Sequence, residues 1–254
     1  MSAKISTRSG EVVSTTEIMI GAIAGMLAGL GHIAVGASSP IPGSAALLTR
    51  ALSKGRTRVS VLGSRENNPF TDGGRELFDC AGQGRIDAFF LSGGQIDGAA
   101  NINLVGIGDL DDYPRARARF PGSFGSSYLY FVVPRVILFR EEHTPRTLVE
   151  RVDFVSAPGV SAPDVYRPGG PSALVTGLCV FAFERTRGRF TLESVHPGVS
   201  AKDVRAATGF DYDAPTRPPE TPALDAASLE LLRTTVAREV AETYPAFAQR
   251  TWGV

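Results

Sequence analysis

Residues 86–97 read IDAFFLSGGQID, and this stretch determines the fold that the rest of the chain is expected to adopt. Its first six residues are apolar except for Asp87, which is typical of a strand covered on both faces in a parallel sheet. Ser92, Gly93 and Gly94 follow, and such small residues let a substrate approach the backbone closely. Their backbone N–H groups can face an oxyanion that develops during a reaction. The stretch therefore predicts a buried strand with a substrate site at its carboxyl end, with tight turns alone as the alternative.

Strand and helix signals alternate on both sides of this stretch and predict an α/β fold. Strands are expected over 32–37 and 59–62, with a helix over 45–52 between them that Ser44 caps. Because a strand–helix–strand crossover is right-handed, the two strands are parallel. The other elements predicted in this part are helices over 15–31 and 76–80 and strands over 86–91, 102–107 and 136–139.

The C-terminal third has a different character. Apolar runs over 173–183 and 190–195 predict a hairpin, and a short helix is expected over 201–207. The prolines within 215–222 form a stiff strap. A final helix begins after Asp225, and its apolar stripe consists of Leu229, Leu232, Val236 and Val240. The expected fold class is an open, mostly parallel sheet flanked by helices, with a C-terminal hairpin and helix.

Length and composition indicate a globular protein. The chain has 254 residues, 43% hydrophobic and 20% charged, which excludes disordered and fibrous classes. Its 26 basic and 26 acidic residues give a formal net charge of zero, so no nucleic-acid partner is expected. Two cysteines exclude a disulfide framework and a cysteine-rich metal site. We expect one domain over 1–254, with an α/β core at 14–170 and the hairpin, strap and helix at 171–254.

The uncharged run over 18–49 resembles a membrane segment only in part. A capping box that starts at Ser14 is typical of a soluble helix, and glycines dilute the apolar run. His32 and Pro40 then interrupt it early. No basic segment adjoins its apolar part, as a signal peptide would require. We therefore expect a cytoplasmic protein without a membrane partner.

Common catalytic motifs are absent from the sequence. There is no Walker P-loop and no complete G-x-G-x-x-G run, and the three histidines lie far apart, so no metal is expected. Arg115, Arg117 and Arg119 alternate and are suited to binding a phosphate, or they form an exposed basic edge. A second glycine-rich cluster follows over 119–127, and we expect it at the same sheet edge as the first cluster.

These motifs, taken in order, resemble the β subunits of family I CoA-transferases, of the glutaconate CoA-transferase type. Residues 92–97 correspond to a Gly-Gly-Ala-Gln-Ile-Asp run in that family. Further matching motifs lie at 101–103, 107–109, 119–125, 152–159 and 197–211. The chain is also similar to the β subunits of the steroid-ring-cleaving hydrolases of this superfamily, especially at 196–199 and 203–205.

The resemblance implies an acyl-CoA substrate and an α-type partner subunit in a heteromer. It implies a coenzyme A thioester as substrate and no permanently bound cofactor. Backbone groups of both glycine clusters would bind CoA and the oxyanion, and the residues concerned are Ser92, Gly93, Gly94, Gln95, Gly122, Ser123, Phe124 and Gly125.

The resemblance also implies a nucleophilic glutamate, which in the transferases attacks the thioester and then carries CoA as a glutamyl-CoA thioester. Alignment on Val35 and Pro40 places that glutamate at Gly63, with Ser64 at the family's serine. Glu66 is the nearest carboxylate. Ser64 and Glu66 are therefore the candidate catalytic residues.

This chain has glycine at the position where the resemblance places the nucleophilic glutamate, and three functions follow from that difference. We expect a hydrolase that acts on an acyl-CoA, at the thioester or at a C–C bond of a cyclic β-dicarbonyl group, with acid–base groups largely from the α subunit. The second function is a CoA-transferase that uses Glu66. The third is a catalytically silent partner that completes the sheet and the CoA pocket.

Overall fold

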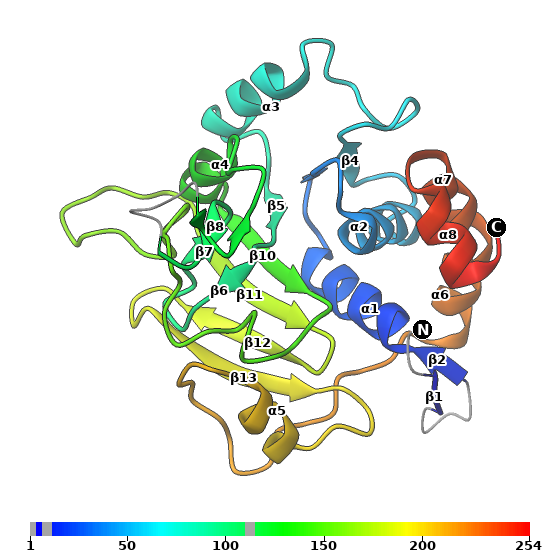
Figure 1. Cartoon of the computed structure of the whole chain (residues 1–254). Helices are drawn as coiled ribbons and strands as arrows, with labels where there is room; N and C mark the ends of the chain where they lie inside the picture. Colours follow the sequence, from blue (N-terminus) through cyan, green and yellow to red (C-terminus); the bar gives the residue numbers. More distant parts are fainter. Residues whose placement is uncertain (1–3, 7–11, 110–114) are drawn as a thin grey trace. The chain divides into compact units, whose positions relative to one another are not determined.

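Residues 4–6, 12–109 and 115–254 are described by a computed structural model of the chain (Figure 1). The chain divides into two units, of which unit 1 is Met1–Phe90 with Thr221–Val254 and unit 2 is Leu91–Glu220. The single domain expected over 1–254, with its parts at 14–170 and 171–254, stays a prediction. Each unit is described by itself below.

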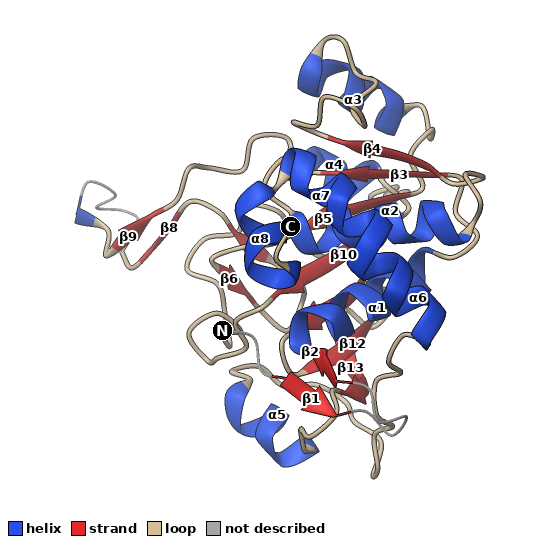
Figure 2. Cartoon of the chain, turned by 90° about the vertical axis from the view of Figure 1, so that its right-hand side faces the viewer, coloured by secondary structure: helices blue, strands red, loops and turns tan. Residues whose placement is uncertain are grey.

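Unit 1 contains parallel strands joined by a helical crossover. β3 (His32–Val35) pairs with β4 (Arg58–Val61) and with β5 (Ala88–Leu91), both in parallel (Figure 2). Val35 and Val61 are opposite one another in the register. The remaining elements before residue 90 are β1 (Lys4–Ser6), β2 (Val12–Ser14), α1 (Thr15–Leu27), α2 (Pro40–Leu52) and α3 (Gly73–Gly82). The predicted parallel crossover is confirmed.

Local sequence signals predicted the start of α1 correctly and misplaced the start of α2. The Glu17 N–H donates to Ser14 Oγ at 3.2 Å and the Ser14 N–H donates to Glu17 Oε2 at 2.8 Å, so the predicted capping box is confirmed. α2, in contrast, begins at Pro40 and not after Ser44, whose hydroxyl donates to Pro40 O at 2.8 Å inside the helix. A proline suits the first helical turn because its missing N–H would have no partner there.

The C-terminal part of unit 1 is a helical segment of several pieces. After Asp225, which accepts the Ser228 N–H at 2.7 Å, come α6 (Ala226–Leu231), a π-helical turn (Leu232–Val236), α7 (Ala237–Thr243) and α8 (Pro245–Trp252). The predicted apolar stripe is buried, and α7 contacts α2 (Figure 1).

The four longest strands of unit 2 have mixed pairing. β10 (Arg135–Arg140) pairs in parallel with β11 (Pro171–Thr176), and β12 (Cys179–Glu184) pairs antiparallel with β11 and with β13 (Arg189–Val195). The single strand expected over 173–183 is therefore wrong, because the chain turns at Gly177. A Cβ there would lie 2.3 Å from Glu141 O, so only glycine fits this turn.

Shorter elements complete unit 2. The strand expected over 102–107 is divided into two short strands. β7 (Ile102–Asn103) pairs with β6 (Gln95–Ile96) (Figure 1). β8 (Gly106–Ile107) pairs with β9 (Ala118–Arg119) (Figure 2). The helices are α4 (Ser126–Val132) and α5 (Ala201–Ala207). Residues 110–114, between β8 and β9, lie outside the described residues. None of the helices in the described part of the chain has both the length and the hydrophobicity that a membrane-spanning helix needs.

Candidate active site

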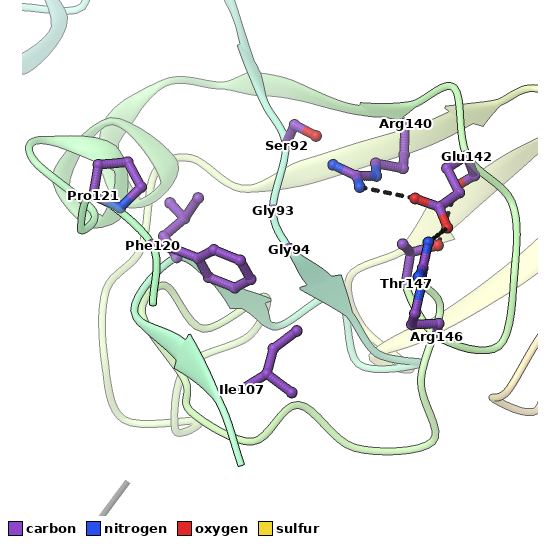
Figure 3. A pocket seen from close by; sticks show the side chains of 11 residues that line it. Ser92, Gly93, Gly94, Ile107, Phe120, Pro121, Arg140, Glu142, Arg146 and Thr147 are labelled. Carbon is purple, nitrogen blue, oxygen red and sulfur yellow. Dashed lines mark hydrogen bonds and ion pairs between the residues drawn. The ribbon is translucent and has the colours of Figure 1, made fainter. Parts of the chain in front are cut away.

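A pocket of about 430 Å³ lies in unit 2, directly after residue 91 (Figure 3). Ser92, Gly93 and Gly94 form one side of it, at the carboxyl end of β5, and their role in binding a substrate stays a prediction. The other lining residues are Leu104, Ile107, Phe120, Pro121, Arg140, Glu142, Arg146 and Thr147. The pocket therefore combines small residues at a strand end, an apolar side and a charged side.

The two glycines of the pocket have packing roles that the sequence did not reveal. A Cβ at Gly93 would lie 2.4 Å from Ile102 Cγ2 and 2.9 Å from Gln95 O. A Cβ at Gly94 would lie 2.1 Å from Phe120 Cζ, so the Phe120 ring covers this glycine. The Gly94 N–H donates to Asn103 O at 2.9 Å and is therefore occupied. An oxyanion-binding role for Gly93 and Gly94 stays a prediction.

Buried amides hold the loop that follows the pocket glycines. Gln95 Oε1 accepts from Asn103 Nδ2 at 2.7 Å and from the Asp153 N–H at 2.9 Å. Asp97 Oδ1 accepts the N–H groups of Ala99 and Asn101 at 3.1 and 3.0 Å. The motifs at 92–97, 101–103 and 152–159, which carry the family resemblance, are thus joined by hydrogen bonds through Gln95. The side-chain oxygen of Gln95 already accepts two hydrogen bonds inside the protein. The expected contact of Gln95 with CoA stays a prediction.

The charged side of the pocket is a feature that the sequence interpretation missed. Glu142 lies between two arginines, with Arg146 Nη2 at 2.6 Å and Arg140 Nη2 at 3.2 Å (Figure 3). The hydrogen bond from Arg146 is the main cause that lowers the pKa of Glu142. Two guanidinium groups share one carboxylate, so this side carries a net positive charge. A signal for it existed, because charged residues follow β10 at its carboxyl end, where α/β proteins bind ligands.

The second glycine-rich cluster reaches the pocket only through its first residues. Phe120 and Pro121 line the pocket, whereas Gly122, Ser123, Phe124 and Gly125 lie outside its lining. The Gly122 N–H donates to Leu104 O at 3.0 Å, and Phe124 is 86% exposed. Binding of CoA or an oxyanion by residues 122–125 stays a prediction.

The three alternating arginines lie on the approach to β9. Arg115, Arg117 and Arg119 are all exposed, and Arg119 pairs with Gly106 in the β8–β9 ladder. None of the three is part of the pocket lining given above. A phosphate contact for them stays a prediction.

The position that the resemblance assigns to the nucleophile lies in a tight turn after β4, in unit 1. Gly63 has φ +89°, a conformation that side chains of L-residues rarely adopt. A Cβ there would meet only the Ala37 Cβ, at 3.8 Å, so the backbone and not a lack of space favours glycine. Ser64 is buried and its hydroxyl donates to Glu242 Oε2 at 2.6 Å, whereas Glu66 is exposed. The catalytic roles of Ser64 and Glu66 stay predictions.

Glu242 is another residue that the sequence interpretation missed. It belongs to α7, and 178 residues separate it from Ser64. Only the tertiary fold brings the two together, and no local pattern could have shown it.

The histidines have structural partners, as their spacing indicated. In unit 2, His143 is buried, with Nδ1 2.7 Å from Thr176 Oγ1 and Nε2 2.8 Å from Thr208 Oγ1. Burial, helped by His196, lowers the pKa of His143 to about 4. In unit 1, His32 Nδ1 lies 2.8 Å from Arg85 O.

Sequence comparisons identify the family of this chain. Residues 18–207 match the family described as coenzyme A transferase, so the chain belongs to that family. It is 34% identical over 165 residues to the B subunit of 3-oxoadipate CoA-transferase from Pseudomonas knackmussii, with 62% of each chain covered. It is 30% identical over 141 residues to the cholesterol ring-cleaving hydrolase IpdB subunit of Rhodococcus jostii, with 54% of each covered. The chain thus spans less than two thirds of the length of these relatives.

Solved structures agree on the fold. Rhodococcus jostii RHA1 IpdAB superposes with a TM-score of 0.76 at 24% identity, covering 89% of this chain and 98% of that one. Glutaconate CoA-transferase from Acidaminococcus fermentans gives a TM-score of 0.75 at 22% identity, covering 87% and 94%. The predicted fold class and the predicted membership of the CoA-transferase family are therefore confirmed.

Proposed function

We propose that this chain is the β subunit of a heteromeric enzyme that adds water to an acyl-CoA. The reaction takes place at the thioester, or at a C–C bond of a cyclic β-dicarbonyl acyl-CoA. The family match supports the CoA thioester. The names of the relatives, which are individual subunits of a CoA-transferase and of a ring-cleaving hydrolase, support an α-type partner.

The observation that carries this proposal is the conformation of Gly63. The resemblance assigns the nucleophilic glutamate of the transferases to this position. With φ +89°, the position disfavours any side chain with a Cβ, by roughly 1–2 kcal/mol. Because glycine has no carboxylate, it cannot form the mixed anhydride or hold CoA covalently. Water then remains as the acceptor.

The pocket in unit 2 is suited to the acyl part of the substrate. Leu104, Ile107 and Phe120 supply an apolar side, and in Figure 3 the backbone at Gly93 lies between Phe120 and the charged side. Hydrolysis also needs a base that removes a proton from water. Glu142 is a weak candidate, because its hydrogen bonds lower its pKa. We therefore assign the acid–base groups to the α-type partner.

A CoA-transferase reaction through Glu66 is the second candidate. Its support is the 34% identity to the B subunit of 3-oxoadipate CoA-transferase. Glu66 is exposed and lies in the same turn as Gly63, which leaves its carboxylate accessible.

The hydrolase and the CoA-transferase differ in the acceptor, which is water in the first and a carboxylic acid in the second. The chain is co-expressed with an α-type subunit of the same family from its own organism, and the complex is mixed with acetyl-CoA, butyryl-CoA, succinyl-CoA, glutaryl-CoA and a cyclic β-diketone acyl-CoA. We expect at least one of these to be consumed at a rate that added acetate or succinate does not change. A rate that rises with the added acid, with transfer of CoA to it, would establish the transferase. If the complex consumes none of the five, the proposed function is wrong.

A further inference from the structure

The turn after β4 is held by a carboxylate from the C-terminal helical segment. Glu242 Oε2 accepts the hydroxyl proton of Ser64 at 2.6 Å, and Glu242 Oε1 accepts the Arg65 N–H at 2.8 Å. These bonds fix two consecutive residues directly after Gly63. A hydrogen bond to a charged acceptor is about twice as strong as a neutral one. Glu242 therefore restrains the turn more firmly than a neutral side chain could.

The same turn has a second attachment, through α2. The Asn67 N–H donates to Ser64 Oγ at 2.8 Å, and Asn67 Oδ1 accepts from Arg50 Nη1 at 2.6 Å. Arg50 also forms an ion pair with Glu239 of α7. Ser64 and Arg65 thus bind Glu242 of α7 directly, and Asn67 is connected to α7 through Arg50.

The residue two positions after Glu242 holds the loop after β3. The Tyr244 hydroxyl donates to Gly36 O at 3.1 Å. Its ring lies against Gly43, where a Cβ would be 2.9 Å from Tyr244 Cε2. Because β3 and β4 are parallel neighbours, the loops that follow them lie at one edge of the sheet. One short segment, 242–244, therefore contacts both loops.

We propose that Glu242 is a positioning residue, which holds the turn at Gly63 and Ser64 in the shape that the acyl-CoA reaction requires. Tyr244 has the corresponding role for the loop after β3. This inference rests on the proposed function. Both residues lie outside residues 18–207, the part that matches the family, so the family match does not assign this role to them.

Glu242 is better suited to positioning than to proton transfer. Hydrogen bonds from Ser64, Thr243 and Arg65, in this order of importance, lower its pKa, so it is ionised at neutral pH. With donors on both oxygens, the carboxylate is a poor base and a poor nucleophile. Burial raises the pKa of Tyr244 to about 12, so its phenol stays a neutral donor.

The test compares Glu242→Gln with two controls on the same helical segment. In Glu242→Gln, an NH2 group replaces one oxygen and faces a donor, so at least one of the bonds to the turn is lost. Glu230→Gln makes the same chemical change at an exposed position. Val240→Ala removes buried packing from α7 without touching the turn. Hydrogen exchange of the Arg65 amide and the kinetics of the complex with the acyl-CoA panel are measured for each.

In Glu242→Gln we expect exchange at Arg65 to rise about tenfold or more. We expect kcat to fall about tenfold or more, with KM changed less than about threefold, because misplacement by 1 Å can cost about a hundredfold in rate. Glu230→Gln changes neither quantity. Val240→Ala lowers the melting temperature but keeps kcat at temperatures well below it.

Three results would overturn the inference. One is a wild-type kcat in Glu242→Gln despite faster exchange. Another is a loss of kcat in Val240→Ala that matches the loss in Glu242→Gln, which would mean that α7 acts only through stability. The third is an acyl group found on Ser64 by mass spectrometry, which would make Glu242 the partner of a nucleophile. If the wild-type complex consumes no acyl-CoA, the proposed function fails, and unchanged exchange in Glu242→Gln would still show that Glu242 does not hold the turn.

Discussion

The Ser64 hydroxyl donates a 2.6 Å hydrogen bond to Glu242, across 178 residues of sequence. The bond connects the turn after β4 with α7 and fixes Ser64 next to a glycine in the left-handed region. A carboxylate is therefore present at this turn, but it comes from a distant helix and its oxygens are engaged. Glu66, in the same turn, is exposed, so the turn has one engaged and one accessible carboxylate.

The first prediction concerns the backbone at Gly63. Replacement by alanine places a Cβ at φ +89°, and we expect the free energy of unfolding to fall by about 1–2 kcal/mol. Gly63→Asn should cost less, because asparagine tolerates this region better. Gly25→Ala is the control, since a Cβ there has open space in α1 and should raise stability by up to about 1 kcal/mol. Urea unfolding measures all three, and equal effects of alanine at 63 and 25 would contradict the account.

The second prediction concerns the wall formed by Phe120 over Gly94. In Gly94→Ala, the added methyl would sit 2.1 Å from Phe120 Cζ, so the ring must move. We expect a loss of about 1–3 kcal/mol from overpacking. We also expect a raised KM for the acyl-CoA that the complex consumes, because the ring lines the pocket. Gly94→Ala combined with Phe120→Leu should recover most of the stability, and failure to do so would place the clash elsewhere.

The third prediction concerns the charged side of the pocket. Arg146→Gln removes the main cause of the lowered pKa of Glu142, and we expect that pKa to rise toward its ordinary value. Carbon-13 NMR titration of the carboxyl groups measures the shift. Arg75→Gln, which breaks an exposed ion pair with Asp72, should leave Glu142 unchanged. An unchanged Glu142 in Arg146→Gln would mean that Arg140 alone holds the carboxylate.

The fourth prediction is a pH dependence from His143. Burial lowers its pKa from 6.5 to about 4, so between these values the unfolded chain binds a proton that the folded protein does not. The contribution to stability is complete above pH 6.5 and is lost as the pH falls toward 4. Its size is about 3 kcal/mol.

Unfolding in urea at a series of pH values tests this dependence. His143→Gln should be less stable at neutral pH, because it loses hydrogen bonds to Thr176 and Thr208. It should also have a flatter pH profile between 4 and 6.5, with His196 supplying part of the remaining slope. Parallel profiles for the variant and the wild type would exclude His143 as the source.

Local patterns predicted those elements that local interactions stabilise. The capping box at Ser14 and the apolar run that forms β5 needed only neighbouring residues to be recognised. The predicted helix start at Ser44 is too late, because prolines commonly mark loops although the first turn of a helix, here at Pro40, accepts them. The division at Gly177 was missed because it depends on a close approach to Glu141 O, which the strand pattern does not contain.

At the candidate site, too, local patterns indicate only those residues whose position depends on their neighbours in the sequence. Ser92, Gly93 and Gly94 could be chosen as candidates because they follow a recognisable strand, and they line the pocket, whereas their binding role stays a prediction. Glu242 reaches the turn after β4 only through the tertiary fold of unit 1, which leaves no local signal in the sequence. Glu142 and Arg146 follow the carboxyl end of β10, a position that does signal a ligand site. Occupation of the Gly94 N–H by a main-chain carbonyl likewise depends on the pairing of β6 with β7.

Mass spectrometry of the complex during turnover tests the central claim most directly. The complex with its α-type partner is incubated with the acyl-CoA that it consumes, quenched, and digested, and the peptide that contains Gly63 and Glu66 is examined. Because no carboxylate at position 63 can attack the thioester, we predict no CoA adduct on this peptide and only a small effect of Glu66→Gln on kcat. A CoA-sized mass increase on Glu66, lost together with activity in Glu66→Gln, would contradict the account and make the protein a CoA-transferase.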